Sequence, residues 1–69
     1  MEVKAELMGM VWKVLVKPGD AVAEEQELII LESMKMEIPV IAPRAGTIQE
    51  VKVKETEVVA ENQVLVTLA

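Results

Sequence analysis

The sequence predicts an all-β domain, and three observations lead to this prediction. Twelve Val and five Ile dominate the apolar residues, and β-branched side chains favour the pleated surface of a sheet. No stretch of ten or more residues has a 3.6-residue apolar period that is free of proline and glycine. Short apolar runs alternate with turn residues along the chain. Its 69 residues leave room for a single domain, residues 1–69, and no second.

Five runs have the length of β-strands, and turn signals separate them. A Lys-Pro-Gly-Asp sequence at 17–20 follows the first run, Ala-Pro-Arg-Ala-Gly at 42–46 follows the third, and Glu-Asn at 61–62 precedes the last. Each run is rich in Val, Ile or Leu, as half-buried strands are. The predicted strands are residues 11–16, 27–32, 36–42, 47–53 and 64–68.

The chain also contains an internal repeat. When it is shifted by 37 residues, residues 9–32 align with residues 46–69 without a gap, and ten of the 24 aligned pairs are identical. Two similar β-meanders that each bury one face are expected to pack on each other about a pseudo-twofold axis. Such an axis places the junction between the halves, residues 33–37, at one end of the domain and both termini at the other.

This junction has an unusual turn sequence. It reads Ser-Met-Lys-Met-Glu between two predicted strands, so we expect a tight hairpin. Two-residue hairpin turns prefer Asn-Gly or Asp-Gly, because their central residues need positive φ. Met-Lys at this place indicates that something other than turn propensity selected these residues.

Composition excludes several classes of function. The chain has no cysteine and no histidine, which excludes disulfides, thiolate metal sites and Ser-His or Cys-His catalytic pairs. A net charge of −5 makes nucleic acid and anionic membranes poor partners. No apolar run approaches the ~20 residues that span a bilayer, and the N-terminus lacks the layout of a signal peptide. We therefore expect a cytoplasmic protein.

The junction and the segments around it resemble a known family. The sequence ESMKMEIPV at 32–40 resembles the attachment hairpin of biotinyl domains, in which a lysine lies between two methionines. AELMGMVWKV and APRAGTIQEV are similar to the two Gly-centred segments of that family, and residues 16–37 to its central half. The whole chain thus resembles the biotinyl/lipoyl-attachment family, and within it the small stand-alone attachment proteins and the biotin carboxyl carrier domains of biotin-dependent carboxylases.

The resemblance implies a fold and a site. The family fold is a hammerhead-like, flattened β-barrel or sandwich of two four-stranded antiparallel sheets with quasi-twofold symmetry. By the same match Lys35 is the residue that carries biotin covalently, and Met34 and Met36 help the modifying ligase to recognise it. Glu32 and Glu37 are interpreted as a solvated rim with a possible accessory role in excluding wrong partners.

The resemblance also implies a function without catalysis by this chain. A biotin protein ligase presents biotinyl-adenylate, and the Lys35 amine attacks it to form an amide. The attached biotin then moves a carboxyl group from a biotin carboxylase site to a carboxyltransferase site, so the domain is a carrier and not an enzyme. We expect a monomer in isolation.

Two other functions stay open. The first is a lipoyl carrier, whose hairpin more often resembles Asp-Lys-Ala, a pattern that is absent here. The second, from another class, is an unmodified β-barrel interaction module, which needs no lysine at the pseudo-twofold junction.

Some positions depart from the family pattern. Glu25 and its repeat partner Asn62 stand where Gly is common, and Thr56 stands where the second turn commonly has Gly. We expect these loops either to form a different turn or to carry strain. The first half has no insertion for the protruding thumb of some bacterial carriers. Trp12 aligns with Gln49, so we expect it to be half-exposed and to pack on the core rather than contact a partner.

Overall fold

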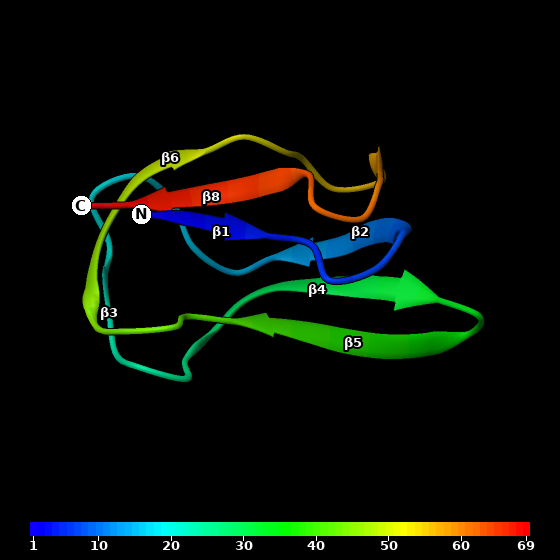
Figure 1. The fold of residues 1–69 in the computed structure, drawn as a ribbon, viewed down its shortest axis with the longest axis horizontal. Coiled ribbons are helices and arrows are strands. Elements are labelled where there is room, and N and C mark those ends of the chain that lie inside the picture. The colour runs from blue at the N-terminus through cyan, green and yellow to red at the C-terminus, as the bar shows by residue number, and fades with distance from the viewer.

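Two four-stranded antiparallel sheets pack face to face in the computed structural model, which describes all residues 1–69. The strand orders are β1-β8-β6-β3 and β5-β4-β2-β7, and the two layers are visible in Figure 1. The predicted all-β fold of two such sheets is therefore confirmed. The strands are β1 (Glu2–Lys4), β2 (Gly9–Val14), β3 (Ala21–Val22), β4 (Glu27–Ser33), β5 (Met36–Ile41), β6 (Gly46–Val51), β7 (Val58–Val59) and β8 (Val64–Leu68).

The strand boundaries differ from the sequence prediction in a regular way. The runs predicted at 11–16 and 47–53 begin earlier and end two residues earlier, as β2 and β6. After these strands the chain leaves the ladder, although the Val at 16 and the Val at 53 remain buried. The sequence prediction included these two residues because their side chains are apolar, which the core requires and a strand does not. The short strands β1, β3 and β7 were not predicted, because two or three residues are too few to show an alternating pattern.

The pseudo-twofold symmetry predicted by the repeat is present in the topology. Strands β2, β3 and β4 have counterparts β6, β7 and β8 37 residues later, and β1 corresponds to β5. Exchanging these labels converts the order of one sheet into that of the other. Each half contributes strands to both sheets, so the halves are interlocked and neither has a sheet of its own. Hydrogen bonds repeat as well: Gly19 N–H donates to the Ile48 carbonyl at 2.8 Å, and Thr56 N–H to the Val11 carbonyl at 2.7 Å.

The core follows the same symmetry. Fifteen residues are buried, all of them apolar, and they come from both sheets. Removal of such apolar surface from water, at roughly 25 cal/mol per Å², is the main favourable term in folding. Fourteen of them form seven repeat pairs, to which Val3 is added: Ala5/Ala42, Val11/Ile48, Val16/Val53, Val22/Val59, Leu28/Leu65, Ile29/Val66 and Leu31/Leu68.

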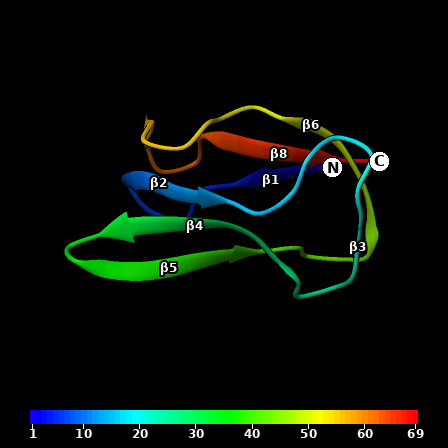
Figure 2. The same cartoon turned by 180° about the vertical axis from the view of Figure 1, so that it is seen from behind.

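The two ends of the domain are different. Both termini lie together at one end, and the β4–β5 hairpin projects at the other (Figures 1 and 2). The Met1 amino group donates a hydrogen bond to the Leu68 carbonyl at 2.8 Å, and Arg44 Nη2 donates to the Ala69 carbonyl at 3.1 Å. The predicted separation of the junction from the termini is therefore confirmed, along a molecule of 30 × 18 × 18 Å. No helix that is long and apolar enough to cross a membrane is present.

Trp12 lies outside the core, and the expectation that it packs there was wrong. It is half-exposed as expected, at 40%. It occupies a β-bulge, because Val11 pairs with Leu31 while Lys13 pairs with Ile30. Since Val11 faces the core, the extra residue of the bulge is left on the outside of the sheet. There Lys13 Nζ lies 5.5 Å from the centroid of the indole ring.

Four turn positions share left-handed backbone geometry in two repeat pairs. Gly19 and Thr56 have φ of 95° and 76°, and Glu25 and Asn62 have φ of 69° and 70°. The loops therefore keep the turn that glycine favours and carry strain instead of forming a different turn. A carboxylate holds the turn at Gly19 and another holds the turn at Thr56: Asp20 accepts a hydrogen bond from the Lys17 N–H, and Glu57 accepts one from the Lys54 N–H. The backbone N–H and ammonium of Lys17 donate to Asp20 at 3.0 and 3.2 Å and lower its pKa.

We expect Thr56→Gly to stabilise the domain and Gly19→Thr to destabilise it. A β-branched residue at positive φ costs about 1–2 kcal/mol, whereas Gly loses about 0.5–1 kcal/mol through its freedom in the unfolded chain. Thr56→Gly should thus gain up to about 1 kcal/mol in the free energy of unfolding by urea. Gly19→Thr should lose a similar net amount, up to about 1 kcal/mol, because a Cβ at Gly19 meets no atom within 4 Å and only the backbone angle opposes it. Equal effects of the same sign would contradict this explanation.

Candidate functional site

Met34 and Lys35 form the whole connection between β4 and β5. Ser33 pairs directly with Met36 across the hairpin, so the turn has two central residues. Both have positive φ, 52° for Met34 and 65° for Lys35, which is the signature of a type I′ turn. The expected tight hairpin is present, and its two central residues each cost about 1–2 kcal/mol in this conformation.

The strands beneath the turn hold it in place. Six residue pairs connect β4 to β5, from Glu27/Ile41 to Ser33/Met36. Leu31, four residues before Lys35, is 1% exposed in the core, and Ile29 is fully buried. A strained turn persists only where its surroundings over-determine it, and here the ladder and the core do so. The lysine is therefore mounted on a rigid support.

The side chains at the turn are directed to solvent. Lys35 is exposed and its amine takes part in no hydrogen bond or ion pair, in contrast to Lys4, Lys17 and Lys52. Met34 is 91% exposed and Met36 62%. The structure thus brings the three predicted site residues together, with an accessible primary amine between two accessible thioethers.

Glu32 and Glu37 form the second residue pair from the turn, next to the Ser33/Met36 pair. They are directly opposite in the β4–β5 ladder, and both are exposed. Like charges in this arrangement destabilise a sheet, and neither carboxylate has a cation partner. The structure places both predicted accessory residues beside Lys35 with their charges uncompensated.

Gly9 is a positioning residue that sequence reasoning missed. A Cβ built at Gly9 would lie 2.8 Å from the Glu32 carbonyl oxygen and 3.5 Å from Ser33 Cβ. Only glycine therefore allows β2 to approach β4 this closely beside the hairpin. The signal in the sequence was the identity of Gly9 and Gly46 in the repeat, since an invariant glycine at equivalent positions indicates close backbone contact.

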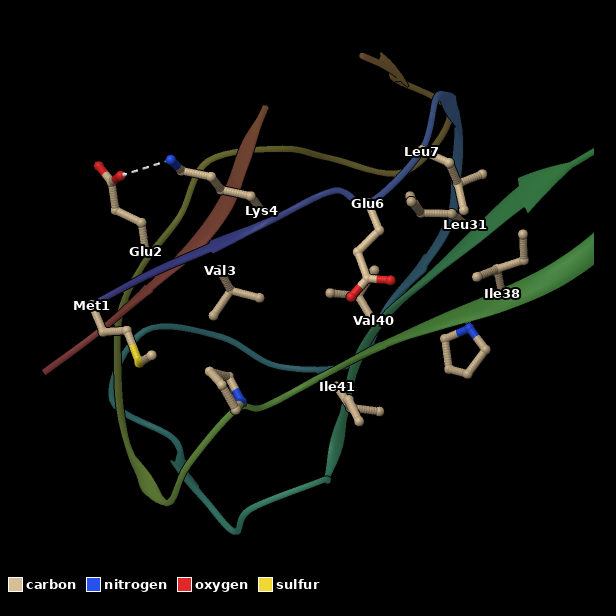
Figure 3. A pocket seen from close by; sticks show the side chains of 12 residues that line it. Met1, Glu2, Val3, Lys4, Glu6, Leu7, Leu31, Ile38, Val40 and Ile41 are labelled. Atoms are coloured by element: carbon tan, nitrogen blue, oxygen red, sulfur yellow. Dashed lines mark ion pairs between the residues drawn. The ribbon is translucent and has the colours of Figure 1, made fainter. Parts of the chain in front are cut away.

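The main hollow on the surface is not at the hairpin. A groove of about 370 Å³ runs between the edge strands β1 and β5, and Val3 lies across it from Ile38, Val40 and Ile41 (Figure 3). Neither Lys35 nor its two methionines line this groove. The chemistry available at the turn is that of an exposed primary amine, a nucleophile on a solvent-facing turn.

Residues 1–68 match the family described as biotin-requiring enzyme, the biotin/lipoyl family. The chain belongs to this family. It is 51% identical to the biotin/lipoyl attachment protein of Bacillus subtilis (strain 168), over the whole of this chain and 94% of that protein. It is 43% identical to the biotin carboxyl carrier protein of Streptococcus mutans, over 94% of this chain but only 50% of that protein.

A solved structure gives the same result for the fold of this biotin/lipoyl domain. The crystal structure of the Kluyveromyces lactis urea carboxylase contains a region that superposes with a TM-score of 0.94 at 26% identity. The match covers all of this chain and 6% of that enzyme. The family resemblance and the two-sheet fold drawn from the sequence are both confirmed.

We expect Gly9→Ala to be clearly more destabilising than Gly46→Ala, its matched control. At Gly9 the new methyl meets a backbone oxygen in the middle of a sheet, where overpacking costs about 1–3 kcal/mol. At Gly46 the neighbours are Ala69 O at 3.2 Å and Arg44 Nη1 at 3.3 Å, a chain end and a flexible side chain that can move. Urea unfolding of both variants measures the difference, and equal stabilities would contradict the close-approach role of Gly9.

Proposed function

We propose that this domain is a biotin carrier and that Lys35 is its attachment residue. The observation that carries the proposal is the unpaired, exposed lysine in a strained two-residue turn, at the one end of the domain where the pseudo-twofold symmetry is broken by a hairpin. Family membership and the carboxyl carrier relative support biotin as the group. Met-Lys makes this turn less stable than Asn-Gly would, and strain of this kind is typical of functional positions.

The attachment reaction follows from the chemistry of a free amine. The uncharged Lys35 Nζ attacks the acyl carbon of biotinyl-adenylate, an amide C–N bond forms, and the C–O bond to AMP breaks. AMP leaves and the nitrogen gives up a proton to solvent. The rigid ladder below the turn fixes the backbone from which the flexible Lys35 side chain extends, and the ligase aligns the amine itself, since misplacement by ~1 Å can cost on the order of a hundredfold in rate. Met34 and Met36 offer the ligase two flexible apolar contacts.

The site fits a covalently held group and needs no cavity for it. Nothing in the chain surrounds the Lys35 amine, so an attached group is held by one bond and projects beyond the end of the domain. Biotin, when attached, supplies the ring nitrogen that accepts a carboxyl group at a biotin carboxylase site and releases it at a carboxyltransferase site. The chain itself breaks no bond and contributes a rigid mount, which raises the effective concentration of the carried group at both sites.

Lipoate on Lys35 is the second candidate. The Bacillus subtilis relative is named a biotin/lipoyl attachment protein, which supports this candidate. Methionine on both sides of Lys35 favours biotin, since the lipoyl hairpin more often resembles Asp-Lys-Ala. The cytoplasmic location and the monomeric state of the isolated domain stay predictions.

We expect Lys35→Arg to abolish biotinylation and leave the fold intact. Incubation of the native chain with a biotin protein ligase, biotin and ATP should add one biotin per chain, located by peptide mapping on Lys35. The guanidinium of the variant stays protonated and is a poor nucleophile, so no label is expected. Because the side chain is exposed, the free energy of unfolding should change by less than about 0.5 kcal/mol.

Lys17 and Lys54 provide internal controls for this experiment. They occupy equivalent positions in the two halves and are both exposed. Lys54 has no ion pair and tests whether exposure alone is sufficient, whereas Lys17 is paired with Asp20. Label on either residue, or a large loss of stability in the Lys35→Arg variant, would defeat the proposal.

A further inference from the structure

The pseudo-twofold symmetry provides an internal comparison between the two outer surfaces. Outside the hairpin residues 33–37, the outward positions on the sheet that carries Lys35 have equivalents, 37 residues away, on the other sheet. The backbone and its hydrogen bonds are the same at both places. A difference in residue type between equivalent outward positions is therefore not required by the fold.

Two rows of residues lie on the outside of the Lys35 sheet. In the first, Met10 is opposite both Glu32 and Val58. In the second, Ile30 is opposite both Pro39 and Lys13. The row between them, Val11, Leu31 and Ile38, faces the core, since Val11 and Leu31 are buried. Because successive residues of a strand point to opposite faces, both flanking rows point outward.

Except for Glu32 and Lys13, the outward positions of these two rows are apolar on the Lys35 sheet, whereas on the other sheet none carries a large apolar residue. Val58 is 69% exposed, although it is a β-branched residue in a two-residue edge strand, and Trp12 is 40% exposed. On the other sheet the same positions carry polar or small residues. We call the five residues Met10, Trp12, Ile30, Pro39 and Val58 the apolar face; their counterparts are Thr47, Gln49, Thr67, Glu2 and Ala21.

The asymmetry indicates a binding surface. Both sheets bury matched apolar residues on their inner sides. Packing of the core therefore does not explain why the outer surfaces of the two sheets differ. An apolar outer surface reduces solubility and is kept mainly where a partner covers it. The apolar face also begins beside Glu32 and Glu37, whose charges have no cation partner within the chain. The complementary surface is thus an apolar one with Lys or Arg at the side nearest the hairpin.

We propose that the apolar face is the docking surface for the biotin protein ligase that modifies Lys35. This inference rests on the proposed function. Before modification the Lys35 amine itself must enter the ligase active site, so the ligase has to surround the end of the hairpin. Ile30 lies on β4 three residues before the strand ends at Ser33, roughly 10 Å at ~3.3 Å per residue, so a protein at the turn reaches the apolar face. After modification the carried group stands beyond the turn, and an enzyme that uses it can leave this face uncovered.

The test replaces the apolar face by the residues of the opposite sheet. In the variant Trp12→Gln, Ile30→Thr, Val58→Ala each new residue already occupies the equivalent position of the same fold. We expect KM for biotinylation by the ligase to rise tenfold or more while kcat stays within about twofold, because docking is lost and the turn is unchanged. Trp12→Gln alone is the second variant, with a smaller rise in KM. The control, Gln49→Ala and Thr67→Ala, changes the equivalents of Trp12 and Ile30 on the opposite sheet and should keep the native KM; the equivalent of Val58, Ala21, is already alanine.

The outcomes separate this inference from the proposed function. A native KM for the folded triple variant would overturn the docking surface and leave Lys35 as the attachment residue. Failure of the native chain to be labelled would overturn the proposed function and this inference with it. Normal labelling of the variant together with poor turnover in a carboxylase assay would assign the face to the carboxylase and not to the ligase. A native dimer in sedimentation that the variant loses would assign it to a second copy of the chain.

Discussion

The packing of two interlocked, similar halves on one small core is the constraint on which the rest of the structure depends. A chain of 69 residues buries only ~60% of the surface that it exposes when unfolded, and here no disulfide or metal cluster assists it. Because each half contributes strands to both sheets, neither half can bury its apolar residues without the other. The seven repeat pairs of the core are the direct consequence.

This symmetry gives the site its place. One end of the domain holds the two chain termini, and the equivalent end holds the continuous β4–β5 hairpin with Lys35 at its turn (Figure 1). The core below fixes the strands, and the strands hold two non-glycine residues at positive φ. The scaffold thus supplies the free energy that an unfavourable turn needs, and the result is an exposed lysine on a rigidly held backbone. The site depends on position, since Lys54 is also an exposed lysine without an ion pair.

Much of this could be predicted from the sequence, for identifiable reasons. The gapless repeat predicted the symmetry and the place of the junction, and the Met-Lys-Met sequence in that junction led to Lys35 as the predicted site. The β-branched runs located the long strands, but β1, β3 and β7 were too short to show a period. Trp12 was wrongly expected to pack on the core, because a β-bulge cannot be read from an apolar pattern and it left the indole outside.

The close approach that requires Gly9 depends on how two strands meet, which no single segment encodes. The family, the fold and the carrier function are confirmed, whereas Lys35 as the attachment residue stays a prediction.

The central claim is that position on the scaffold singles out Lys35 for biotin. The most direct test is the intact mass of the protein isolated from its own cells, followed by peptide mapping of the modified residue. The account predicts one biotin per modified chain, on Lys35, with every other lysine unmodified. Lipoate on Lys35, biotin on another lysine, or a chain that is never modified would contradict it.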